Sequence, residues 1–135
     1  GSAGNATYNF HYNHLIALSL DNKTENPTFS ILPKYQKTYN DFGQISSYKL
    51  LTLNQEKWLF INSHKKYVQQ PYKTPNTNKL EFSYLVNVYN FKEIIPIPAD
   101  KKLSILTDLI IKNENNTYTV FGFKKGKLWI GEFSY

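Results

Sequence analysis

The sequence predicts an all-β protein built from two small units in tandem. Along most of the 135 residues, apolar side chains alternate with polar ones or form short blocks, and helical periodicity is scarce. Turn-forming residues interrupt these blocks at intervals of about ten residues, which is typical of β-sandwiches and small barrels. A pattern that occurs twice along the chain indicates the division into two units.

The repeated pattern begins with a tyrosine and ends with a tryptophan after a polar turn. Tyr48 and Trp58 mark the first copy, and Tyr118 and Trp129 mark the second. The tyrosines lie 70 positions apart (118 − 48) and the tryptophans 71 (129 − 58). Each copy predicts a β-hairpin with the polar turn as its loop. Because repeated positions usually belong to a core, we expect both tryptophans to be buried, with stacking on a sugar or peptide as the alternative.

The expected strands follow one another along the chain. Each is a run of residues with β-branched, aromatic or alternating apolar side chains. In the first half they span 14–20, 28–32, 46–53, 57–62 and 66–69. In the second half they span 81–89, 92–97, 103–111, 117–123 and 128–133. Asn-, Asp-, Gly- and Lys-rich turns separate them at 21–23, 40–43, 54–56, 113–116 and 124–127.

A linker is predicted at 71–79, which is polar, carries two prolines and contains no aliphatic residue. The first unit then spans 5–70 and the second 80–135. Residues 1–4 resemble an expression-vector remnant and are not expected to belong to the fold.

The tyrosine strand, polar hairpin and tryptophan-led strand resemble bacterial SH3-like (SH3b) domains and their GW-module relatives in surface proteins. Residues 48–68 carry the pattern in the first copy and 118–131 in the second. The resemblance implies two tandem SH3-like small barrels that attach a secreted protein to the cell wall without catalysis. In that family, GW-type modules bind anionic teichoic or lipoteichoic acid, and others bind peptidoglycan. The Gly-Trp dipeptide is replaced here by Lys57-Trp58 and Leu128-Trp129.

The charge of the chain favours a polyanionic partner. The net charge is +6, and all sixteen basic residues are lysines. Specific nucleic-acid recognition usually uses the guanidinium fork of arginine, so we expect no nucleic-acid partner. Lysines near turns are the candidate polymer contacts, although solvated turns are the simpler interpretation: Lys65, Lys66, Lys101, Lys102, Lys124, Lys125 and Lys127. Tyrosines near loops are the candidate aromatic contacts, with partial burial as the alternative: Tyr35, Tyr39, Tyr67 and Tyr72.

No catalytic residue, metal site or cofactor is predicted. Cysteine is absent, and His11 and His14 would face opposite sides of one strand. No nucleophile, phosphate-loop or zinc motif occurs. No apolar run approaches the roughly 18 residues of a membrane span, so no transmembrane segment is expected. The family resemblance implies an extracellular, wall-associated protein.

Two other functions are compatible with the sequence. One is a single barrel of about eight to ten strands around a small apolar ligand, which predicts a continuous sheet across 71–78. The other is a protein–protein interaction module of a surface-layer or toxin–immunity system.

Overall fold

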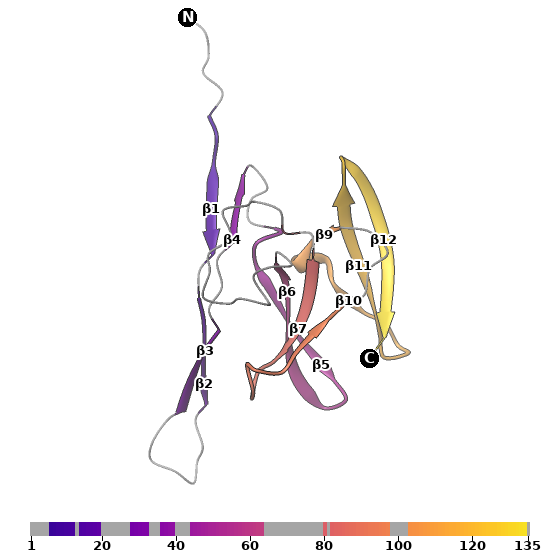
Figure 1. The fold of residues 1–135 in the computed structure, drawn as a ribbon. Helices are drawn as coiled ribbons and strands as arrows, with labels where there is room; N and C mark the ends of the chain where they lie inside the picture. Colours follow the sequence, from indigo (N-terminus) through magenta and orange to yellow (C-terminus); the bar gives the residue numbers. More distant parts are fainter. Residues whose placement is uncertain are drawn as a thin grey trace, which may run out of the picture.

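The structure, a computed structural model, consists almost wholly of β-strands. It describes residues 6–12, 14–19, 28–32, 36–39, 44–63, 80, 82–97 and 103–134. These residues form twelve strands and one short 3-10 helix, so the all-β prediction is confirmed. None of the sheets formed by the described strands closes on itself, so two closed barrels are not confirmed. Figure 1 shows a central sheet between a narrow N-terminal part and a second sheet that ends the chain.

The central sheet has four antiparallel strands in the order β5-β6-β7-β8. Their bounds are β5 (Tyr48–Leu53), β6 (Glu56–Ser63), β7 (Phe82–Asn87) and β8 (Ile94–Pro96). Strand β6 pairs with β5 on one side and with β7 on the other, in a register that sets Trp58 opposite Asn87. Strands β6 and β7 lie on either side of the expected linker at 71–79, so the two expected units share one sheet.

The second sheet surrounds β11. Its strands are β9 (Ser104–Ile105), β10 (Ile111–Lys112), β11 (Thr117–Lys124) and β12 (Lys127–Ser134), and η1 (Thr107–Leu109) lies between β9 and β10. Strand β11 pairs with β12 along its whole length, and its other side pairs with β10 and β9. The continuous strand expected at 103–111 is therefore interrupted by η1. In η1 the hydroxyl of Thr107 donates to the carbonyl of Gln44 at 3.0 Å, which turns the chain away from an extended path.

The main hydrophobic core lies between these two sheets. The central sheet contributes Leu51, Leu53, Trp58, Phe60 and Leu85, and the chain from β9 to β11 contributes Ile105, Ile110, Tyr118 and Val120. Phe133 of β12 completes the contact, since its ring stacks on that of Tyr118 at a centroid distance of 5.3 Å. The two halves of the chain therefore bury each other's apolar side chains.

The N-terminal part consists of two strand pairs. Strand β1 (Asn9–Tyr12) pairs with β4 (Gln36–Tyr39), and β2 (Leu15–Ser19) pairs with β3 (Thr28–Leu32). Strands β1 and β4 were not expected from the sequence, because their polar residues weaken the strand pattern. A second cluster, of Leu32, Leu59, Ile61, Tyr84 and Val86, joins this part to the face of the central sheet opposite the main core. The strand expected at 66–69 lies outside the described residues.

A buried asparagine joins four segments of the chain. Asn62 has no exposed surface, and its Nδ2 donates to the carbonyls of Ile45 at 2.9 Å and Ile105 at 2.6 Å. Its Oδ1 accepts from the hydroxyl of Ser83 at 2.9 Å, and its backbone carbonyl accepts from the side chain of Gln36. Asn62 thus satisfies polar groups from both sheets in the interior.

Candidate functional site

Two tight hairpins organise the molecule, and both were expected from the repeated pattern. Strands β5 and β6 are joined by Asn54 and Gln55, with φ values of 47° and 68°. Strands β11 and β12 are joined by Lys125 and Gly126, with φ values of 48° and 73°. Two successive positive φ values are the mark of a type I′ turn, which matches the right-handed twist of paired strands. Both predicted hairpins are therefore confirmed.

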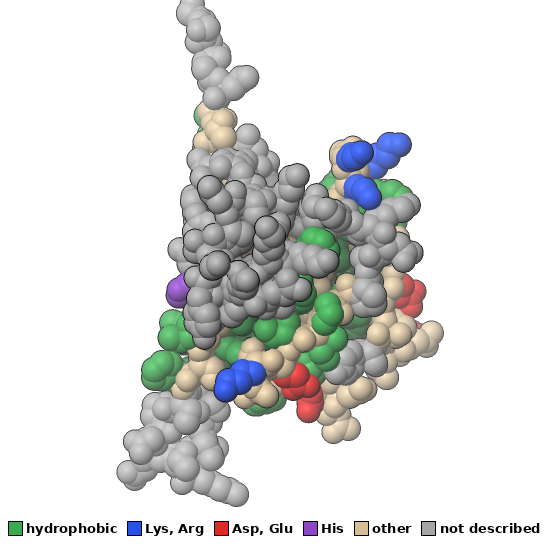
Figure 2. Space-filling model, in the orientation of Figure 1, with side chains coloured by type: hydrophobic (Ala, Val, Ile, Leu, Met, Phe, Trp, Pro, Cys, Tyr) green, Lys and Arg blue, Asp and Glu red, His purple; other side chains and the backbone are tan. Residues whose placement is uncertain are grey.

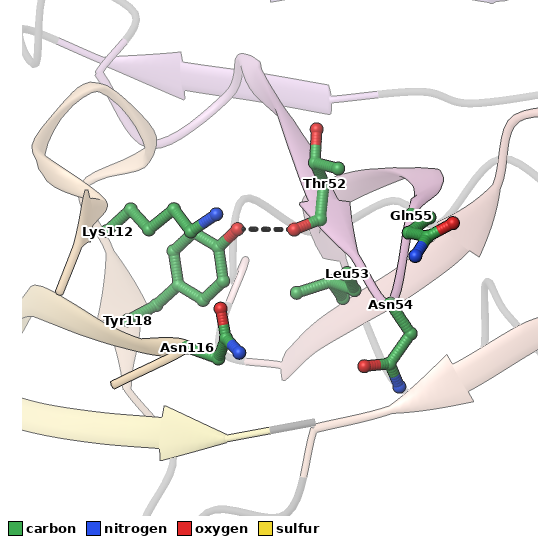
Figure 3. A pocket seen from close by; sticks show the side chains of 7 residues that line it. All are labelled: Thr52, Leu53, Asn54, Gln55, Lys112, Asn116 and Tyr118. Atoms are coloured by element: carbon green, nitrogen blue, oxygen red, sulfur yellow. Dashed lines mark hydrogen bonds between the residues drawn. The ribbon is translucent and has the colours of Figure 1, made fainter. Parts of the chain in front are cut away.

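A pocket of about 320 Å³ lies beside the Asn54-Gln55 turn. One wall is the end of β5 and its turn, and the other is formed by β10, the turn after it and the start of β11. Figure 3 shows the two walls on opposite sides, with Tyr118 and Lys112 of one wall extending toward Thr52 of the other. They are Thr52, Leu53, Asn54, Gln55, Lys112, Asn116 and Tyr118. The pocket therefore lies where the two halves of the chain meet.

One hydrogen bond joins the two walls of this pocket, and others support each wall by itself. The hydroxyl of Tyr118 donates to the carbonyl of Thr52 at 2.8 Å, across the junction between the sheets (Figure 3). Lys57 Nζ donates to the Thr52 hydroxyl at 2.7 Å. The turn that carries Asn116 is closed by Asn113, whose backbone N–H donates to the carbonyl of Thr117 at 2.9 Å. Both walls are thus anchored by strands and by direct bonds.

The chemistry of the pocket suits a hydroxylated, anionic ligand. Its side chains offer three primary amides, from Asn54, Gln55 and Asn116, which both donate and accept hydrogen bonds. Lys112 adds one positive charge, and no carboxylate is among the lining residues that the structure describes. Buried Leu53 and Tyr118 supply an apolar base. Such a pocket can bind a sugar or polyol hydroxyl beside a phosphate or carboxylate.

Among the expected ligand contacts whose side chains the structure describes, which are Lys124, Lys125 and Lys127, none lines this pocket. The Asn-rich segments 54–56 and 113–116 were predicted only as turns. Their meeting depends on the packing of one sheet on the other, which no local pattern encodes. The abundance of amide side chains in the two turns was the one sequence feature that indicated a role for these segments in binding.

The expected lysine contacts are only partly described. Lys124, Lys125 and Lys127 lie together at the end of the β11–β12 hairpin, with Lys125 and Lys127 exposed and Lys124 half-buried. This end is opposite to the one at which β11 begins beside the pocket. Of Tyr39 only the backbone position in β4 is described. The remaining candidates lie outside the described residues: Lys65, Lys66, Lys101, Lys102, Tyr35, Tyr67 and Tyr72.

The two repeated tryptophans differ in burial. Trp58 is 1% exposed and belongs to the main core, as expected. Trp129 is 37% exposed, so the expectation that it is buried was wrong. Each lies three residues after the last turn residue of its hairpin, opposite Leu51 and Gly122 respectively. Trp58 is covered by the second sheet, whereas Trp129 lies close to the free end of its hairpin.

Across the described ranges, no three His, Cys, Asp or Glu side chains are grouped to hold a metal ion. Within the same part of the chain, no helix has the length and apolar character of a membrane span. Comparisons with protein-family models, curated proteins and solved structures found no match for this chain.

Proposed function

We propose that this protein is a non-catalytic module that binds an anionic polymer of the bacterial cell envelope. The preferred ligand is teichoic or lipoteichoic acid, and peptidoglycan is the other wall polymer of suitable chemistry. The observation that carries the proposal is the pocket between the Asn54-Gln55 turn and the β10–β11 turn, whose described lining has three amides, one ammonium group and no carboxylate.

The size of the pocket supports a polymer ligand. Its volume of about 320 Å³ is at the lower end of the range for small-molecule sites, which suits one repeat unit of a chain. Hydroxyl groups of that unit would bond to the amides of Asn54, Gln55 and Asn116. A phosphate would lie beside Lys112, since lysine binds phosphate as a point charge.

The charge distribution supports the same ligand. The chain carries a net charge of +6, and a second group of lysines lies at the end of the β11–β12 hairpin. A long polyanion can contact two cationic sites on one molecule, which raises its apparent affinity through effective concentration. Contacts of this kind weaken as salt screens the charges.

The relation to SH3-like wall-binding modules is part of this proposal. Support comes from the two type I′ hairpins, each with a tryptophan three residues after its last turn residue. On this account the chain contains two SH3-like units that share a core, and the protein acts outside the cell at the wall.

The first experiment measures binding of soluble glycerol-phosphate teichoic acid to the full chain by calorimetry. Gln55→Gly and Asn116→Gly each remove one amide and retain a residue that accepts the positive φ of that turn. Each should weaken binding about fivefold, the equivalent of roughly 1 kcal/mol for a lost hydrogen bond. Lys112→Gln should weaken it by about tenfold or more, because it removes a charge-assisted contact.

Two controls make this experiment decisive. Lys92→Gln removes the same charge from an exposed residue outside the pocket and should retain wild-type affinity within about twofold. The polymer recovered after incubation should keep its length, because the proposed module is non-catalytic. Wild-type affinity in all three pocket variants, or a shortened polymer, would contradict the proposal.

A protein–protein interaction module is the second candidate, and one observation favours it. The β2–β3 pair exposes four apolar side chains on one face, with Ile16 opposite Ile31 and Leu18 opposite Phe29. Their exposed fractions are 68%, 49%, 61% and 68% in that order. If the β2–β3 face is a protein interface, Leu18→Ser with Phe29→Ser should abolish copurification of a partner and leave polymer binding unchanged.

A further inference from the structure

The two type I′ hairpins carry different residues in nearly the same backbone geometry. The β5–β6 turn has φ values of 47° and 68° at Asn54 and Gln55, and the β11–β12 turn has 48° and 73° at Lys125 and Gly126. Gln55 and Gly126 therefore occupy equivalent positions. Comparing them separates the effect of a side chain at this position from the effect of the turn itself.

Glycine is the residue that this position favours. The central residues of a type I′ turn need a positive φ, which glycine adopts without steric cost and asparagine tolerates. Asn54 and Gly126 suit their positions, and so does Asn116, whose φ is 55°. Gln55 does not, because in the left-handed region its Cβ crowds the following carbonyl. The backbone thus explains the two asparagines and leaves the glutamine unexplained.

The difference between the two turns coincides with the pocket. Gln55 is exposed and lines the pocket, on the wall opposite Asn116 (Figure 3). Gly126 is not among the described lining residues. Its turn lies at an extremity of the molecule, where Figure 2 shows basic side chains projecting. An unfavourable backbone conformation beside a pocket indicates that the side chain serves the ligand.

We propose that Gln55 is the specificity-determining residue of the pocket, with an amide that recognises a hydroxyl beside the anionic group of the ligand. Lys112 attracts any phosphate as a point charge, whether or not a hydroxyl lies nearby. The amide of Gln55 donates and accepts hydrogen bonds, and a ligand without the hydroxyl forfeits them. The inference rests on the proposed function and names what the pocket selects, which is a polyol phosphate with a free hydroxyl.

The first test compares the thermal unfolding of two reciprocal variants. Gln55→Gly should raise the midpoint by about 2–4 °C, because the relief of crowding exceeds the entropy that glycine adds to the unfolded chain. Gly126→Gln makes the opposite change in the other turn, where a Cβ would meet none of the described atoms within 4 Å. It should lower the midpoint by a similar amount. A Gln55→Gly variant no more stable than the wild type would overturn the inference.

The second test measures ligand preference by chemical-shift titration of the full chain with two small probes. Glycerol 3-phosphate and n-propyl phosphate share the carbon chain and the phosphate and differ in their hydroxyls. The wild type should prefer glycerol 3-phosphate by about fivefold or more, as expected for gained hydrogen bonds. Gln55→Gly should lower this preference by about threefold or more. Gln55→Asn keeps an amide and tolerates the positive φ, so it should retain most of the preference.

Two controls separate this role from charge and from the turn. Lys112→Gln should weaken the binding of both probes alike and leave the preference unchanged. Gly126→Gln should bind both probes like the wild type. A preference that survives in Gln55→Gly, or a wild type that binds the two probes equally or binds neither, would overturn the inference.

The role of Gln55 and the proposed function can fail separately. A chain that prefers glycerol 3-phosphate through Gln55 and does not bind teichoic acid would refute polymer binding alone. A chain that binds teichoic acid, with the same probe preference in Gln55→Gly as in the wild type, would refute only the role of Gln55.

Discussion

At the scale of single residues, Asn62 is the clearest determinant of stability. Replacing it by alanine would leave the carbonyls of Ile45 and Ile105 and the hydroxyl of Ser83 without their partner in the interior. A buried polar group without a hydrogen bond costs about 1–3 kcal/mol. We therefore expect Asn62→Ala to lower the free energy of unfolding in urea by about 3 kcal/mol or more.

The control for Asn62 is a surface asparagine. Asn90 is exposed, and its side chain accepts one hydrogen bond from the backbone of Lys92 at 3.2 Å. Asn90→Ala should change the free energy of unfolding by no more than about 0.5 kcal/mol. Similar losses in the two variants would refute the role assigned to Asn62.

Tyr84 should make the fold sensitive to alkaline pH. Burial raises the pKa of its hydroxyl above the ordinary 10.0. Below pH 10 the tyrosine is protonated in both the folded and the unfolded chain, so its full contribution to the free energy of unfolding is present. As the pH rises above 10, the unfolded chain loses this proton first, so stability falls. Urea unfolding between pH 8 and pH 11 should show a shallower alkaline loss for Tyr84→Phe than for the wild type; parallel curves would refute this.

The tryptophans and tyrosines of the repeat show what residue patterns can and cannot predict. Tyr48 is 45% exposed, whereas its counterpart Tyr118 is 3% exposed. The spacing of 70 between the tyrosines and 71 between the tryptophans differs by one residue. Because side chains alternate between the faces of a strand, one residue is enough to move a position to the opposite face. The pattern predicted the hairpins and missed which tyrosine enters the core.

At the scale of elements, the pairing of β9 with β11 requires a glycine at position 122. A Cβ at Gly122 would lie 2.9 Å from both Leu103 Cγ and the carbonyl oxygen of Ser104. The backbone oxygen cannot move without displacing β9. We expect Gly122→Ala to destabilise the protein by about 1–3 kcal/mol, as overpacking does, measured as a lower midpoint of urea unfolding.

Gly131 provides the matched control on the neighbouring strand. A Cβ there would meet only Val120 Cγ2, at an ordinary 3.7 Å. Gly131→Ala should be neutral or slightly stabilising, because alanine lowers the entropy of the unfolded chain. A Gly122→Ala variant as stable as Gly131→Ala would show that β9 is not held against β11.

Strands were predicted correctly where apolar residues are dense. The prediction failed where long-range contacts determine the path of the backbone. Strands β5, β6, β7, β11 and β12 agree with their expected spans within about two residues. The split of 103–111 into β9, η1 and β10 depends on a bond from Thr107 to the distant Gln44. No local pattern encodes that bond, and the same holds for the pocket formed by two turns that meet across the sheets.

At the scale of the whole molecule, the two halves of the chain, each with one copy of the repeated pattern, pack around one shared core. Strand β7 pairs with β6 across the expected linker, and the main core draws side chains from both sheets. We therefore expect a chain cut at a protease site inserted within 71–79 to remain associated in native size-exclusion chromatography. The fragments should separate only in denaturant. Two stable halves that separate after cleavage would instead support independent barrels.

Binding to the bacterial wall is the central claim, and one measurement tests it most directly. The full chain is applied to purified wall sacculi, with and without prior removal of teichoic acid, and eluted with increasing salt. Intact sacculi should retain the protein at low salt and release it as screening weakens the contacts of Lys112 and the other lysines, while stripped sacculi should retain little. Retention that survives both high salt and removal of teichoic acid would contradict the polyanion account.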